Sequence, residues 1–129
     1  MAMAMRAFDR LMLTVHVASP PTDAEWARWI EMCRKRSGLE ARVIVENYSS
    51  GPNVLQRRSL AEVVRGEDAM CAVLTDSKIE RAALTAIAWL GMSLRGFPLS
   101  GHQAAADYLK LTSQELALGL EVLPLMRQE

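Results

Sequence analysis

Short apolar runs alternate along this chain with longer amphipathic segments, and this alternation restricts the fold more than any other feature of the sequence. The clearest runs lie at 11–18, 41–45 and 70–74 and are rich in valine, leucine and isoleucine. Continuous apolar runs of this kind are typical of strands that are buried on both faces of a parallel sheet. The segments between the runs carry apolar residues at helical spacing. The order predicts an α/β fold with a mainly parallel sheet.

Three amphipathic segments begin with the pattern of a capping box, in which a serine or threonine is followed by glutamate three positions later. The pattern occurs at 22–25, 77–80 and 112–115. The first predicts a helix over about 23–36, and the second predicts a helix that runs to about residue 90. The third predicts a last helix that frays after Pro124, because proline cannot continue the hydrogen-bond ladder.

The helix predicted from residue 77 has more apolar residues than one face requires. Ile79, Ala82 and Ala86 belong to a stripe at helical spacing, while Leu84 and Trp89 lie on other faces. A surface helix buries only one apolar face. The surplus predicts a second contact around Leu84 and Trp89.

The remaining elements complete a sheet of four or five strands with about four to five helices. Residues 3–8 predict a first strand, joined to the next run by a hairpin turn at Asp9 and Arg10. Residues 94–98 predict a short edge-like strand, and a further helix is expected to open at residues 100–103. All of 1–129 is predicted to form a single layered domain, since a chain of 129 residues leaves no room for a second core.

Within that domain we expect a core over about 8–111 and a C-terminal helical extension over 112–129. Fifteen basic and fifteen acidic residues give a formal net charge of zero. The average composition therefore holds no attraction for nucleic acid, and no segment approaches the roughly 18 apolar residues of a membrane span. Cys33 and Cys71 lie inside apolar patterns, which predicts core thiols and a reduced, cytoplasmic setting.

The motifs of common enzymes are missing from the sequence, which has no phosphate-binding loop, no G-x-S-x-G and no H-E-x-x-H. His16 and His102 are far apart, and neither stands at ligand spacing from cysteine or acid, so no metal and no cofactor is predicted. Asp76 follows a predicted strand and is interpreted as part of a turn. A non-enzymatic protein is expected. A cryptic catalytic site built from His16, Asp76 and His102 is the weakest alternative.

One turn is the best functional candidate in the sequence. It follows the apolar run at 41–45 and reads Tyr48-Ser49-Ser50-Gly51-Pro52-Asn53. At the start of the next helix, free N–H groups and the macrodipole favour a negative group, either bound phosphate or a phosphorylated side chain. The alternative is structural: Ser50 or Asn53 caps the helix while Gly51 and Pro52 set the turn.

The order of elements, together with the segments AVLTD (72–76), LRGF (94–97) and AAADYL (104–109), resembles the STAS family. These SpoIIAA-like domains are related to anti-sigma-factor antagonists, and their fold group includes Sec14-like lipid-binding domains. The resemblance covers roughly Phe8 to Leu111. It implies a SpoIIAA-like fold and a bacterial regulatory protein.

Antagonists of that family carry a segment of the type Asp-Ser-Ser-Gly-Leu-Gly at the start of the second main helix, where a partner kinase phosphorylates the serine after the aspartate. The matching segment here makes Ser49 the candidate phosphoacceptor by position and Ser50 its neighbour. Tyr48 replaces the acidic residue, and Pro52-Asn53 replaces Leu-Gly.

The leading hypothesis is therefore a non-enzymatic, regulatory protein–protein interaction module that is switched by phosphorylation at Ser49 or Ser50. Its expected partner is another protein: a kinase, an anti-sigma-like protein or another signalling protein. The apolar helix faces leave a homodimer open. The predicted partner-binding residues are Tyr48, Gly51, Asn53, Arg57 and Arg58. The alternative hypothesis is a small-ligand or lipid-binding module of the Sec14-like branch.

Overall fold

The computed structural model describes residues 3–17, 21–35, 40–48, 55–56, 69–88 and 93–129. Within them a five-stranded sheet has the strand order β1-β2-β3-β4-β5. The strands are β1 (Met3–Phe8), β2 (Leu11–His16), β3 (Arg42–Asn47), β4 (Met70–Leu74) and β5 (Leu94–Phe97). β1 is antiparallel to β2, and all other neighbours in the sheet are parallel. The predicted α/β fold with a mainly parallel sheet is confirmed.

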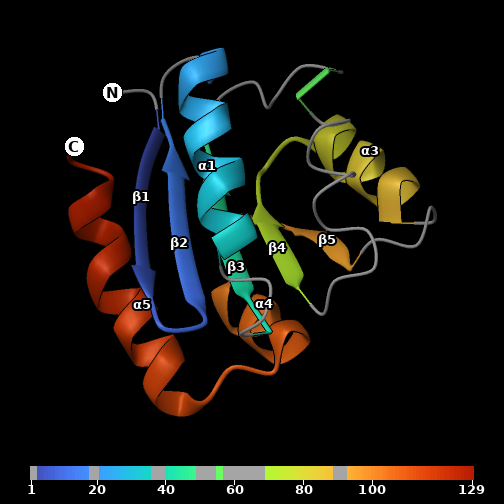
Figure 1. The fold of residues 1–129 in the computed structure, drawn as a ribbon. Coiled ribbons are helices and arrows are strands. Elements are labelled where there is room, and N and C mark those ends of the chain that lie inside the picture. The colour runs from blue at the N-terminus through green and yellow to red at the C-terminus, as the bar shows by residue number, and fades with distance from the viewer. Residues whose placement is uncertain (1–2, 18–20, 36–39, 49–54, 57–68, 89–92) are drawn as a thin grey trace.

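Four helices lie within the described residues and cover the sheet (Figure 1). They are α1 (Asp23–Lys35), α3 (Lys78–Ala88), α4 (His102–Leu109) and α5 (Ser113–Met126). None of these helices is long and apolar enough to cross a membrane. The helix expected after the turn at 48–53 falls outside the described residues, apart from residues 55–56. Helix α5 continues past Pro124 to Met126, so the predicted fraying point is wrong.

The predicted hairpin at the start of the chain is confirmed. Phe8 is paired with Leu11, which leaves Asp9 and Arg10 as the two-residue turn. Asp9 has a φ of 52°. Tight hairpin turns of two residues require positive φ, and aspartate tolerates the left-handed region better than most residues.

Side chains alternate along each strand, so the sheet buries one apolar cluster on each face. Leu13 and Ile44 belong to the cluster that includes residues of α4 and α5, whereas Met12 and Val43 belong to the cluster that includes residues of α1. Helix α5 contributes Leu123 and Met126 to the first cluster; both are 1% exposed.

Two tryptophans of α1 belong to the apolar cluster on the α1 face of the sheet, and both have defined partners there. The rings of Trp26 and Trp29 stack with their centroids 4.9 Å apart. Trp29 Nε1 donates to Thr14 Oγ1 at 2.7 Å, and Trp26 Nε1 donates to the Gln56 carbonyl at 2.9 Å. Both buried indole N–H groups are therefore satisfied, which removes the cost of placing them in the core.

The two cysteines are free and buried, as predicted for core thiols. Burial raises the pKa of the Cys71 thiol, because the low-dielectric surroundings disfavour the thiolate.

Three residues of the predicted apolar stripe of α3 do not face the core. Ile79 is 85% exposed, and Ala82 and Ala86 are exposed too. Leu84 packs against the α1-side cluster instead. Gly96 explains the orientation: a Cβ there would lie 3.3 Å from Leu84 Cδ1, so the glycine allows α3 to approach β5 closely. Trp89 lies outside the described residues.

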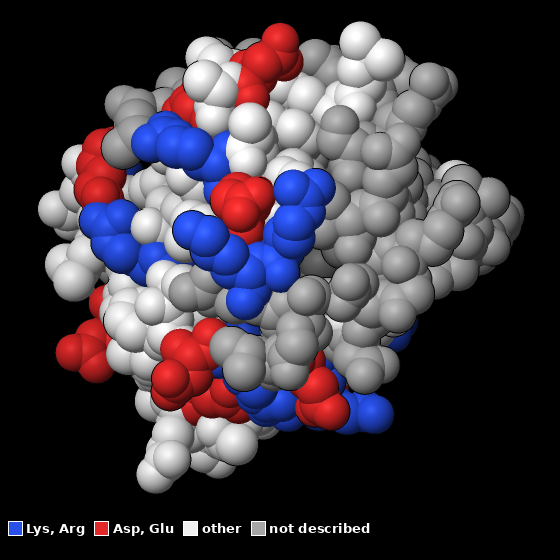
Figure 2. Space-filling model, in the orientation of Figure 1, with Lys and Arg blue, Asp and Glu red and all other residues white. Residues whose placement is uncertain are grey.

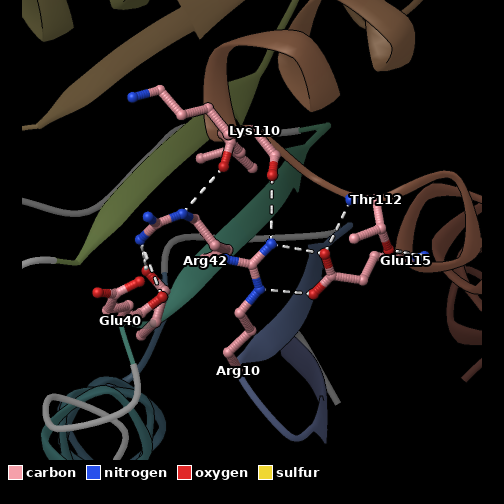
Figure 3. A network of polar contacts seen from close by, with 8 residues as sticks. Arg10, Glu40, Arg42, Lys110, Thr112 and Glu115 are labelled. Atoms are coloured by element: carbon pink, nitrogen blue, oxygen red, sulfur yellow. Dashed lines mark hydrogen bonds and ion pairs between the residues drawn. The ribbon is translucent and has the colours of Figure 1, made fainter.

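An ion pair at the amino-terminal ends of the parallel strands fastens the start of α5 (Figure 3). Arg10 Nε and Nη2 donate to the two carboxylate oxygens of Glu115 at 2.8 and 2.7 Å. Arg10 Nη2 also donates to the Lys110 carbonyl at 3.2 Å. Thr112 and Glu115 exchange the two hydrogen bonds of the predicted capping box, which is confirmed. We call Arg10, Thr112 and Glu115 the amino-end clamp.

Arg42, the first residue of β3, makes further hydrogen bonds at the amino-terminal ends of the parallel strands (Figure 3). Its Nε donates to the Leu109 carbonyl at 2.9 Å, and its Nη1 donates to the Glu40 carbonyl at 2.8 Å. The carbonyls at the end of α4 have few partners within the helix, so a guanidinium placed there satisfies one of them. The connection from α4 to α5 is thereby held on the sheet.

Candidate functional site

Polar side chains gather at the carboxyl-terminal ends of β2, β3 and β4, directly after the apolar parts of these strands. His16, Glu46, Asn47 and Thr75 are each at most 4% exposed. In open α/β sheets, ligand sites lie outside the carboxyl ends of the strands, because the loops that follow the strands meet there. This end of the sheet is therefore the place where a functional site is expected.

Glu46 is the centre of one group of side chains, which we call the Glu46 cluster. Arg127 Nε donates to Glu46 Oε1 at 2.7 Å, and Arg127 Nη2 donates to Oε2 at 2.6 Å. The Tyr48 hydroxyl donates to Oε1 at 3.0 Å, and His102 Nε2 lies 2.5 Å from Oε2. A carboxylate has about four acceptor sites. All four are occupied, so the buried charge of Glu46 is fully compensated.

The hydrogen bonds of Glu46 control its protonation. Burial raises the pKa of this carboxyl group, but the hydrogen bonds from Arg127, His102 and Tyr48 favour the charged form more strongly and lower the pKa to about 2. Glu46 is therefore ionised at neutral pH although it is 0% exposed. An ionised, immobile carboxylate orients the three side chains that bind it.

His102 receives its orientation from Glu46. Because Glu46 Oε2 can only accept, Nε2 of the imidazole carries a proton, and Nδ1 is an acceptor whenever the ring is neutral. A carboxylate that fixes a histidine in this way is also found in catalytic dyads. His102 makes no other polar contact with the described part of the chain, and thus no nucleophile is placed beside it there.

A second group, the Asn47 cluster, lies on the other face of β3. Asn47 Nδ2 donates to Glu80 Oε1 at 2.6 Å, and Asn47 Oδ1 accepts from His16 Nδ1 at 3.0 Å. Thr75 Oγ1 donates to Glu80 Oε2 at 3.2 Å. Successive residues of a strand point to opposite faces, so Glu46 and Asn47 join helices on both sides of the sheet to its carboxyl end.

The capping box predicted at residues 77–80 forms only in part. The spacing at 77–80 predicted a capping box, in which the Glu80 carboxylate would accept from the Ser77 N–H. Glu80 N does donate to Ser77 Oγ at 3.1 Å, but the Ser77 N–H donates to Thr75 Oγ1 at 3.2 Å. Only half of the box forms, because the carboxylate binds Asn47 and Thr75.

Tyr48 connects the buried Glu46 cluster with the protein surface. Its backbone N–H donates to the His16 carbonyl at 2.8 Å, which continues the pairing of β2 and β3 by one residue. The residue is 43% exposed although its hydroxyl is bound to the buried Glu46. The ring is therefore an exposed aromatic group with few conformations left to lose.

The structure describes only one residue of the predicted site. Tyr48 lies at the carboxyl-terminal edge, as expected from its position after a strand. The other predicted site residues fall outside the described residues: Ser49, Ser50, Gly51, Asn53, Arg57 and Arg58.

The residues of the weakest alternative, the cryptic catalytic site, are not brought together. His16 belongs to the Asn47 cluster and His102 to the Glu46 cluster, on opposite faces of the sheet. Asp76 was interpreted as part of the turn before Ser77; its Oδ1 accepts from the Leu99 N–H at 3.0 Å, so its side chain binds a different turn, the one after β5. Among the described residues, no group of three or more histidine, cysteine or acidic side chains could hold a metal ion.

Sequence reasoning missed Glu46 and Arg127 as site residues. A signal for Glu46 existed, since an acidic residue directly follows the apolar run Val43-Ile44-Val45. A carboxylate at the end of a buried strand requires a partner of opposite charge. The sequence held no comparable signal for Arg127, which caps the carboxyl end of a helix that was expected to fray before it.

Comparison with known proteins gives no identification. A scan against protein-family models finds no matching family, a search of curated proteins finds no similar chain, and a search of solved structures finds none either. The resemblance to STAS domains therefore stays a prediction.

Proposed function

We propose that this protein is a regulatory protein–protein interaction module whose contact surface is the carboxyl-terminal edge of the sheet. The surface consists of Tyr48 and the segment that follows it, with Ser49 or Ser50 as the phosphoacceptor. The observation that carries the proposal is the state of Tyr48: the residue is 43% exposed, while its hydroxyl is bound by a carboxylate whose residue, Glu46, is 0% exposed.

An exposed, pre-oriented tyrosine is suited to bind a protein. Tyrosine is enriched among the residues that contribute most to protein interfaces, and a ring that is already ordered loses little conformational entropy on binding. The neighbouring Arg127 and His102 are partly exposed, with 34% and 19% of their side chains accessible. They extend the polar rim around the tyrosine ring.

The same geometry disfavours a small anionic ligand at this place. Arg127 and His102 already bind Glu46, and an anion would have to take them away from it. Glu46 would then keep a buried charge with fewer partners, which costs several kcal/mol. A protein that docks on the ring of Tyr48 leaves these contacts in place.

The test begins with the protein isolated gently from its host, by native mass spectrometry, to identify a bound second chain. The affinity of the purified partner is then measured for the wild type, for Tyr48→Ala and for a control, Leu120→Ala. Leu120 is also large and exposed, at 49%, but lies on α5 away from the strand ends. We expect Tyr48→Ala to weaken binding about tenfold or more, and Leu120→Ala to leave it unchanged.

Regulation is tested by intact-mass analysis and by Ser49→Asp. A phosphate that maps to Ser49 or Ser50, with a changed partner affinity in Ser49→Asp, supports the switch. Unchanged affinity in Ser49→Asp removes the switch. Unchanged affinity in Tyr48→Ala removes the contact surface itself. A monomer that carries only a small-molecule adduct would favour the ligand-binding alternative.

A further inference from the structure

A shallow groove lies between β1 and α1, on a different part of the molecule from the Glu46 cluster. Its volume is about 370 Å³. Three of its lining residues are methionines: Met3, Met5 and Met32. Met3 is buried and the other two are half-buried, so they form the floor. Methionine side chains are flexible and polarisable, which lets such a floor adapt to apolar groups of different shape.

The rim of the groove is basic. Arg6, Arg28 and Lys35 line it and are exposed, and Glu31 is the one acid in the described lining. Glu31 is also ion-paired with Arg34 at 3.3 Å. The formal net charge of the chain is zero, so this excess of positive charge is local. Figure 2 shows lysine and arginine side chains, with acidic side chains between them, over the face that carries α1 and β1.

Arg6, at the edge of the sheet, contacts both a main-chain carbonyl and a carboxylate. Its Nη1 donates to the Met5 carbonyl at 2.7 Å, and its Nη2 is ion-paired with Glu129. β1 has a strand neighbour on one side only. The bond to Met5 therefore covers a carbonyl that an added strand would need. The ion pair with Glu129 is solvent-exposed and contributes little, so another carboxylate can replace it.

These features together select a kind of ligand. The floor fits apolar side chains, the rim fits carboxylates that flank them, and the covered edge disfavours an added strand. We propose that the groove between β1 and α1 binds an acidic amphipathic helix of a partner protein. An apolar stripe lies on the methionines, and acidic residues beside the stripe contact Arg28 and Lys35.

The probe is a fluorescently labelled synthetic peptide with leucines at helical spacing and glutamates beside them. A matched peptide has lysine in place of every glutamate. Binding is measured by fluorescence anisotropy at low and moderate salt, alongside sedimentation with vesicles that contain phosphatidylserine. We expect the acidic peptide to bind and the basic peptide not to bind. Moderate salt should weaken binding several-fold, because rim charges are screened.

The test variant is Arg28→Glu/Lys35→Glu, and the control is Lys78→Glu. All three residues are exposed, and Lys78 lies on α3, outside the groove. Thermal unfolding shows that each variant is folded. We expect the double variant to lose about tenfold or more in affinity for the acidic peptide and to gain affinity for the basic one. Lys78→Glu should bind like the wild type.

Three results would overturn the proposal. The first is that the wild type binds neither peptide, and the second is that it binds both equally. The third is that the vesicles bind in a way that depends on Arg28 and Lys35 while the acidic peptide does not. None of these measurements involves Tyr48, so the groove and the proposed contact surface at the strand ends are tested separately.

Discussion

Helix α5 is fastened to the sheet by an arginine–glutamate pair at each end, and the two pairs differ in how they are built. At its start, Glu115 of the helix binds Arg10 with two hydrogen bonds. At its end, Arg127 binds Glu46 of β3 in the same bidentate way. Each charge also suits its end of the helix dipole, which favours an acid at the start and a base at the end. Local chemistry alone does not separate a structural pair from a functional one.

The difference lies in the remaining partners. The amino-end clamp binds main-chain groups, the Thr112 N–H and the Lys110 carbonyl, and Glu115 is 20% exposed at its side chain. Glu46 is 0% exposed and binds side chains, those of Tyr48 and His102, that reach the surface. A carboxylate that binds the main chain stabilises the fold. One that is buried beneath partly exposed side chains also orients those side chains.

Removing each arginine in turn should give the largest difference between the two pairs. Arg127→Leu leaves the charge of Glu46 buried with only His102 and Tyr48, and we expect a loss of about 3–5 kcal/mol in the free energy of unfolding at neutral pH. Arg10→Leu should cost about 1 kcal/mol, because Glu115 can be hydrated. Urea unfolding of both variants measures the difference.

The double variant Glu46→Leu/Arg127→Leu is the control for this prediction, since it removes both charges together. We expect it to recover most of the loss, because a buried pair replaced by apolar residues is often nearly neutral. Equal losses in Arg127→Leu and Arg10→Leu would show that the two pairs are equivalent.

Lowering the pH should reduce stability more through Glu46 than through Glu115. The pKa of Glu46 is lowered from 4.5 to about 2 in the folded protein, so its contribution is complete above pH 4.5 and is lost as the pH falls toward about 2. The shift corresponds to about 3 kcal/mol at most. Stability measured across this range should fall with decreasing pH, and Glu46→Gln should flatten the fall.

Glu115→Gln is the matched comparison for the acid experiment. In the folded wild type the pKa of the Glu115 carboxyl is also lowered to about 2, chiefly by the hydrogen bond from Arg10. Because its side chain is partly exposed, solvent screening reduces what the shift contributes to stability. We therefore expect a smaller flattening than in Glu46→Gln. The opposite order would place the main acid-sensitive group at the amino-end clamp.

Tyr48→Phe separates the contribution of the Tyr48 hydroxyl from that of the ring. It keeps the ring and removes one hydrogen bond to Glu46, and we expect a loss of about 1.5 kcal/mol in stability. Affinity for the partner should fall less than in Tyr48→Ala, because the contact area of the ring remains. An affinity in Tyr48→Phe as low as in Tyr48→Ala would mean that the hydroxyl itself contacts the partner.

The smallest effect is expected at the other end of α5. Thr112→Ala removes the side-chain cap of Glu115 N, and helix caps of this kind contribute about 1 kcal/mol. Chemical unfolding should show this loss, while partner affinity stays at the wild-type value. A change in affinity would connect the amino-end clamp to the contact surface.

The sequence predicted the elements whose causes are local. The hairpin at Asp9 and Arg10 and the capping box at 112–115 depend on residues that are close together in the chain, and each strand of the sheet is a local apolar run, although its pairing is not local. The box at 77–80 had the same spacing but formed only in part, because Asn47 and Thr75 compete for Glu80. Those competitors come from neighbouring strands, and the spacing of one segment does not contain them.

The site was predicted less completely than the fold, for the same physical reason. The strand end after Val45 and the exposed Tyr48 are local features. The partners of Glu46 are separated from it by 56 positions at His102 and by 81 at Arg127. Which distant side chain reaches a buried carboxylate depends on how α4 and α5 pack, and that is decided by the whole core.

The long separation between Glu46 and Arg127 has a consequence for synthesis of the chain. During translation, β3 leaves the ribosome long before residue 127 does, so the carboxylate of Glu46 waits without its main partner. Non-local contacts of this kind form late, after the loop between them has closed. In a nascent chain Glu46 therefore lacks its bidentate partner, and the proposed contact surface around Tyr48 is complete only when α5 has docked.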